Sequence, residues 1–93
     1  MCPNNLNFQL KTAVLEIKMS KFETAKKRLK NIIISNPYFK EAYYNLGSIY
    51  MNVEEDYKKA LKYFTISLEL DPDYQQSVNN IEYLKKQMIS EYK

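Results

Sequence analysis

The chain of 93 residues has room for one domain, 1–93, and its hydrophobic fraction of 45% argues against disorder. Its 14 basic and 11 acidic residues leave a net charge of +3, which is too small to indicate nucleic acid as the partner, and no apolar run reaches the roughly 18 residues that a membrane span requires. One cysteine and no histidine exclude an intrachain disulfide, leave zinc almost without ligands, and favour a reducing, cytoplasmic compartment.

The first predicted helix, at about residues 6–19, has its apolar and small residues on one side. They are Leu10 and the residues three, four and seven positions after it, Ala13, Val14 and Ile17. A third predicted helix, at about 38–52, has the same spacing in Tyr43, Leu46, Gly47 and Tyr50. The two sets lie 33 residues apart, which indicates an internal repeat.

The second and fourth predicted helices, at about 21–35 and 56–70, repeat each other at an offset of 35 residues. The matching pairs are Phe22 and Tyr57, Ala25 and Ala60, Leu29 and Phe64, Ile32 and Ser67, and Pro37 and Pro72. Proline disfavours helix in the residue before it, so both helices are expected to end at the polar residue that precedes the proline.

A fifth helix is predicted at about 73–90, with Val78, Ile81, Leu84 and Met88 as its apolar stripe and a polar opposite side. A helix of this kind at the end of a repeat array is typical of a cap.

Ion pairs between residues four apart are expected for Glu54 with Lys58, Glu55 with Lys59, and Glu82 with Lys86.

Residues 43–72 carry a specific pattern. It comprises Tyr43, Leu46, Gly47 and Tyr50, then Tyr57, Ala60, Phe64 and Asp71-Pro72. This pattern resembles the tetratricopeptide repeat. The resemblance implies an all-α fold of five helices, a right-handed superhelical stack of antiparallel helical hairpins. Repeat one is expected at about 7–37, repeat two at about 38–72, and the capping helix at about 73–90. Repeat one departs from the family with Val14 in place of Gly and Ile17 in place of Tyr.

The resemblance implies that a partner's peptide or helix lies in a concave groove lined by the first helix of each hairpin. Residues on these helices that lie off the packed stripe are expected to face it, with Phe8, Leu15, Tyr44, Met51 and Tyr83 as apolar anchors. The full set is Phe8, Lys11, Leu15, Lys18, Glu41, Tyr44, Asn45, Ser48, Met51, Asn52, Gln76, Asn79, Tyr83 and Lys86.

In the same family, a clamp of Asn and basic residues holds the C-terminal carboxylate of a chaperone. Asn45 matches one clamp position, but the last helix offers Gln75, Gln76, Asn79 and Asn80 where cations are required. Without cations the carboxylate lacks a charge-assisted bond, which argues against a chaperone tail as the ligand.

The expected function is therefore a protein–protein interaction module, an adaptor or scaffold. Self-association into an assembly is one alternative, because an open stack end invites a second copy. RNA binding is the weaker one, since Glu41 is expected to offset Lys11, Lys18 and Lys86 on the inner face. No catalytic constellation, cofactor or metal site is expected, because the chain has no histidine and no Gly-rich phosphate loop. The basic run of residues 26–30 is interpreted as a solvated helix face.

Overall fold

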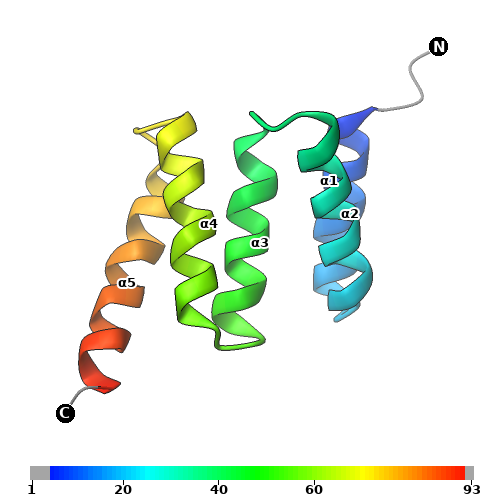
Figure 1. Cartoon of the computed structure of the whole chain (residues 1–93). Coiled ribbons are helices and arrows are strands. Elements are labelled where there is room, and N and C mark those ends of the chain that lie inside the picture. The colour runs from blue at the N-terminus through cyan, green and yellow to red at the C-terminus, as the bar shows by residue number, and fades with distance from the viewer. Residues whose placement is uncertain (1–4, 92–93) are drawn as a thin grey trace.

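The computed structural model describes residues 5–91, so Cys2 lies outside the described part. The described residues form five helices and no strand (Figure 1). The helices are α1 Leu6–Lys18, α2 Phe22–Ser35, α3 Lys40–Asn52, α4 Tyr57–Leu70 and α5 Gln75–Glu91. The predicted all-α class and the five helices are confirmed. None of the helices in this part of the chain is long and apolar enough to cross a membrane.

The proline turns at the ends of α2 and α4 have the same geometry. Asn36 and Asp71 both adopt φ −147° and ψ 94°. The Asn36 side chain accepts a hydrogen bond from the Tyr38 amide at 3.0 Å, and the Asp71 side chain accepts one from the Asp73 amide at 3.1 Å. Each side chain thus gives a backbone N–H of the turn the hydrogen-bond partner that a helix would otherwise provide. As a result α3 and α5 each begin two residues later than predicted, at 40 and 75.

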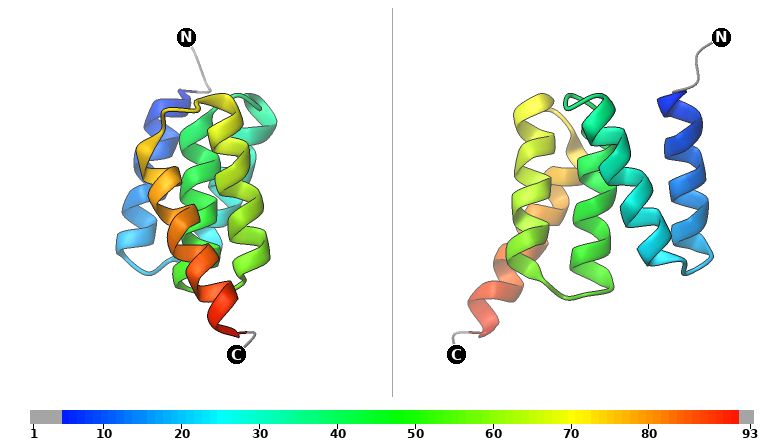
Figure 2. Two further views of the ribbon diagram at one scale, coloured as in Figure 1. Left: turned by 90° about the vertical axis from the view of Figure 1, so that its left-hand side faces the viewer. Right: turned by 45° about the vertical axis from the view of Figure 1, so that its right-hand side comes forward.

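The five helices stack in chain order and form two layers. Each helix contacts the next one, α1 contacts α3, and α3 contacts α5, whereas α2 and α4 have no contact with each other in the described structure. Figure 2 shows this arrangement along the stack, with α1 and the start of α5 on one side and α4 on the other. The stack measures 54 × 28 × 18 Å along its principal axes. Antiparallel hairpins packed in series are therefore present.

One continuous core joins all five helices. No hairpin encloses it alone, so each unit depends on its neighbours for burial. Its buried members are Ala13, Ala25, Leu29, Ile32, Ala42, Leu46, Ile49, Tyr50, Met51, Ala60, Phe64 and Leu84. Each of the larger aliphatic or aromatic side chains contributes about 1.5–3 kcal/mol when it is fully removed from water.

The ion pairs differ from those predicted. The three predicted pairs within helices are not formed among the described residues. Glu54 precedes α4, where Asp56 instead caps the helix by accepting from the Lys59 amide at 3.2 Å. The Glu54 carboxylate therefore turns away from the helix and pairs with Lys26 of α2. This pair links the first hairpin to the second.

The basic run of residues 26–30 is only partly a solvated face. Lys26 pairs with Glu54 and with Glu23, and Arg28 binds Glu16 of α1 through two hydrogen bonds of 3.0 and 3.1 Å. Lys27 and Lys30 are exposed, as predicted. Half of the run's four cations therefore hold helices together.

Candidate functional site

The residues predicted to line a groove occupy equivalent positions on three helices that contact one another in series, α1, α3 and α5. The offsets of 33 and 35 residues that relate the repeats sort twelve of them into four sets, with Asn45 and Asn52 additional. The sets are Phe8, Glu41 and Gln76; Lys11, Tyr44 and Asn79; Leu15, Ser48 and Tyr83; and Lys18, Met51 and Lys86. This surface is termed the α1–α3–α5 face.

Apolar side chains are exposed along α1. Phe8 is 67% exposed and Leu15 is 56% exposed, as the sequence predicts for groove anchors. Met19, the C-cap residue that follows α1, is 54% exposed and is not among the residues predicted for the groove. It is the equivalent of Asn52 at the offset of 33, so applying the repeat consistently would have included it.

The middle helix of the face contributes fewer exposed apolar groups than predicted. Met51 is only 9% exposed and belongs to the core that joins the hairpins, so its prediction as an exposed anchor is wrong. Tyr44 is half-buried because its ring packs on Phe64 at 5.8 Å and edge-on to Tyr74 at 5.5 Å. On α5, Tyr83 is exposed as predicted.

Two of the amide side chains on the face are engaged within their own helices. Asn45 donates from Nδ2 to the Glu41 carbonyl at 2.8 Å, and Asn79 accepts from Gln75 at 2.9 Å. Asn45, which was compared with a clamp position of tetratricopeptide repeats, therefore uses its amide nitrogen on the backbone of its own helix. Asn52 and Gln76 are exposed, and Ser48 is half-buried.

The charges on the face are unbalanced. Lys11, Lys18 and Lys86 are exposed, and none has a carboxylate within 4.0 Å in the described part of the chain. Glu41 is half-buried and forms no ion pair with these lysines, so it does not neutralise their charges by direct contact as expected. Its negative charge instead contributes to the raised pKa values of Lys40 and Tyr74.

Tyr74 lies beside this face in the turn between α4 and α5. Burial is the main cause that raises its pKa from 10.0 to about 12, and the negative charge of Glu41 adds to it. Lys40 lies over the Tyr74 ring, 5.1 Å from its centroid, and pairs with Asp71. The hydrogen bond from Lys40 is the largest cause that lowers the pKa of Asp71. This cluster secures the start of α3 to the start of α5.

Three other tyrosines of the hairpin formed by α3 and α4 take part in packing. Tyr50 is stacked on Tyr63 at 5.5 Å, and the ammonium groups of Lys26 and Lys59 each lie 5.3 Å from the Tyr50 ring centroid. Tyr43 donates its hydroxyl to the Pro37 carbonyl at 2.8 Å. Cations over an aromatic face are attracted by its quadrupole, so these lysines support packing.

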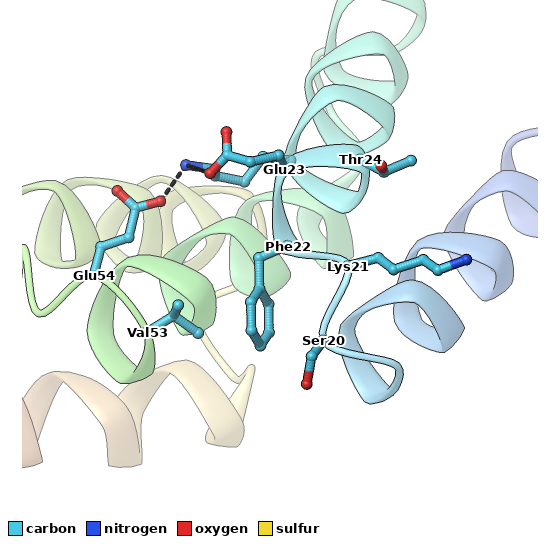
Figure 3. Close-up of a pocket in the computed structure, with 8 residues that line it drawn as sticks. Ser20, Lys21, Phe22, Glu23, Thr24, Val53 and Glu54 are labelled. Carbon is cyan, nitrogen blue, oxygen red and sulfur yellow. Dashed lines mark hydrogen bonds and ion pairs between the residues drawn. The ribbon is translucent and has the colours of Figure 1, made fainter.

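A separate open pocket lies where the turn of the first hairpin meets the turn of the second (Figure 3). The Phe22 ring lies beside Val53 (Figure 3), and Lys26 pairs with Glu54 at the same pocket. The hydrogen bond that Lys26 donates to Glu54 is the main cause that raises the pKa of Lys26. The lining residues are Ser20, Lys21, Phe22, Glu23, Thr24, Lys26, Val53 and Glu54. The pocket shares no residue with the α1–α3–α5 face. Among the described residues no group of His, Cys, Asp and Glu could hold a metal ion.

Comparison with known proteins finds no family model that matches the chain and no curated protein that is similar to it.

Proposed function

We propose that the chain is a protein–protein interaction module of the tetratricopeptide type, which holds a segment of a partner protein on the α1–α3–α5 face. The observation that carries the proposal is the exposure of Phe8, Leu15 and Met19 along α1. Each contributes about 1.5–3 kcal/mol when a partner covers it fully, the scale that a small, transient interface requires.

The proposal includes a right-handed superhelix with this face on its concave side. It is supported by the contacts of α1 with α3 and of α3 with α5, because α2 and α4 lack such a contact in the described structure. Closer packing on one side of a stack bends it toward that side. A partner segment on the inside of the bend contacts several helices at once, which enlarges the interface that a thin array offers. We also propose that the protein acts in the cytoplasm, and we propose no enzymatic activity.

Self-association by end-to-end stacking is less well supported. Ala42 and Ile49 of α3 are fully buried or nearly so, and their equivalents on α1 are Gln9 and Glu16. The Glu16 carboxylate binds Arg28, so polar groups occupy the positions where a preceding hairpin requires apolar ones. The first end of the stack is thus unsuited to a second copy.

Selection of binders from a displayed library of random 16-residue peptides tests the proposed function. The variant Leu15→Glu places a charge on the α1–α3–α5 face, and Ile34→Glu is its matched control because Ile34 is 78% exposed on α2. Peptides selected on the wild type should bind Ile34→Glu within twofold of the wild type. They should bind Leu15→Glu at least tenfold more weakly. Circular dichroism confirms that both variants fold, and equal binding to Leu15→Glu would overturn the proposal.

A further inference from the structure

The amide side chains of the α1–α3–α5 face indicate what conformation its ligand has. An extended peptide exposes an N–H and a C=O at every residue, and these need hydrogen-bond partners on the receptor. Asn45 and Asn79 each use one amide group within their own helices, which leaves Asn52 and Gln76 as the exposed amides of the predicted set without such a bond. A helical segment satisfies its own backbone and requires only apolar and charged groups from the receptor, which this face offers.

The apolar groups on α1 have the spacing that a second helix matches. Phe8, Leu15 and Met19 are separated by seven and four residues, so they lie on one side of the helix. The span of eleven residues corresponds to about 16 Å at 1.5 Å per residue. A partner helix of three to four turns with one apolar residue per turn covers this length.

The charged groups beside these anchors are cations. Lys11 and Lys18 flank Leu15 on α1, and Lys86 lies on α5; all three are exposed without a carboxylate in reach among the described residues. Glu41, the acid at the predicted positions, is half-buried. A ligand with carboxylates beside its apolar stripe therefore complements this face, and one with cations there is repelled.

From these three observations we infer that the ligand of the α1–α3–α5 face is an acidic amphipathic helix of a partner protein. This inference rests on the proposed function and specifies the partner's chemistry. RNA fits the face less well, because single-stranded RNA needs a series of stacking aromatics along a continuous basic track. The aliphatic Leu15 and Met19 offer no such platform.

Three labelled peptides of 16 residues test the inference by fluorescence anisotropy. The first peptide has one leucine per helical turn and glutamate at the positions beside this apolar stripe. The second has lysine in place of each glutamate. The third has the same composition as the first in scrambled order. An oligouridylate of similar length is the fourth probe. The wild type should bind the first peptide at least tenfold more tightly than each of the other three probes.

Charge reversal on the protein gives the second readout. Lys11→Glu with Lys18→Glu should weaken binding of the glutamate peptide at least tenfold and improve binding of the lysine peptide. Lys27→Glu with Lys30→Glu is the matched control, because it makes the same change of charge on exposed residues of α2, and it should stay within twofold of the wild type.

Each contrary result has a separate meaning. Equal binding of the lysine and glutamate peptides, preference for the scrambled peptide, or no binding of any peptide probe overturns the inference. The proposed function then still stands if the peptides from the random library lose affinity on Leu15→Glu. Tighter binding of oligouridylate, abolished by the double reversal on α1, also overturns the inference in favour of RNA. Retained library binding on Leu15→Glu overturns the proposed function itself.

Discussion

The backbone of Gly47 in α3 lies directly against the ring of Phe64 in α4. A Cβ atom at position 47 would lie 2.7 Å from Cε1 and 2.8 Å from Cδ1 of that ring. Carbon atoms without a bond between them prefer separations of about 3.5–4.0 Å. Phe64 is fully buried, so its ring has no free space into which to turn. In the first unit the equivalent positions hold Val14 and Leu29, a larger residue opposite a smaller one.

Gly47→Ala should therefore destabilise the protein. Alanine favours a helix over glycine by about 0.8–1 kcal/mol, but overpacking against a buried ring costs about 1–3 kcal/mol. We expect a net loss of about 1 kcal/mol in the free energy of unfolding, measured in urea by circular dichroism. The variant Phe64→Leu should relieve the clash, so the double variant should lose less than the two single variants together. Additive losses would contradict the proposed contact.

Ser67 and Ser77 form a buried hydroxyl pair between α4 and α5. The Ser67 hydroxyl lies within hydrogen-bond distance of both the Ser77 hydroxyl and the Phe64 carbonyl, and both serines are fully buried. Ser67→Ala should cost about 1–3 kcal/mol because it leaves Ser77 without this partner. Changing both to alanine should cost less than Ser67→Ala alone, since the equivalents Ile32 and Ala42 are buried without such a pair. Urea unfolding of the four proteins of this cycle measures the coupling, and its absence would contradict a shared hydrogen bond.

The helices could be predicted from the sequence because local signals agree with the packing. The spacing of Leu46, Gly47 and Tyr50 marks the buried side of α3, and Asn36-Pro37 marks the end of α2. α3 and α5 begin two residues after the positions that the sequence predicts, because the side-chain turns at Asn36 and Asp71 occupy the residues between the proline and the helix. A proline indicates where a helix ends, but it does not indicate how the next one starts.

The site was less predictable than the helices. A position off the packed stripe of one helix is buried if a neighbouring helix covers it, as happens to Met51. The ion pair between the hairpins could not be predicted from the sequence either. Lys26 and Glu54 are 28 residues apart and come together only where the two turns adjoin. Spacing within a helix reveals its own faces, whereas the neighbours that cover those faces depend on how the hairpins are placed.

Glu55 has a left-handed backbone, with φ at 52°, in the turn between α3 and α4. This conformation costs a residue with a side chain roughly 1–2 kcal/mol, and glycine adopts it freely but loses more entropy on folding. Glu55→Gly should therefore raise the free energy of unfolding by about 0.5 kcal/mol. The control is Lys62→Gly, which lies exposed in the interior of α4 and should lower the free energy of unfolding by about 1 kcal/mol. Equal losses in thermal unfolding of both variants would show that the turn does not strain Glu55.

Because the pKa of Tyr74 is raised in the folded state, the free energy of unfolding changes with pH in the alkaline range. The unfolded chain ionises this tyrosine near 10.0, whereas the folded chain keeps it protonated to about 12. The unfolded state therefore binds fewer protons between these values, and the free energy of unfolding falls as pH rises through them. Below pH 10 the contribution of Tyr74 to the free energy of unfolding is fully present.

Tyr74→Phe keeps the ring that packs on Tyr44 and lies under Lys40, but it removes the ionisable hydroxyl. Its free energy of unfolding should fall less steeply than that of the wild type between pH 10 and 12, measured in urea by circular dichroism. Tyr38→Phe is the matched control, because Tyr38 is 78% exposed, and its slope should equal that of the wild type. Lys26 and Lys40 also have raised pKa values and lose their contributions in the same range, so the comparison between variants isolates Tyr74. Identical slopes for Tyr74→Phe and the wild type would mean that the hydroxyl is not shielded by the turn that joins α4 to α5.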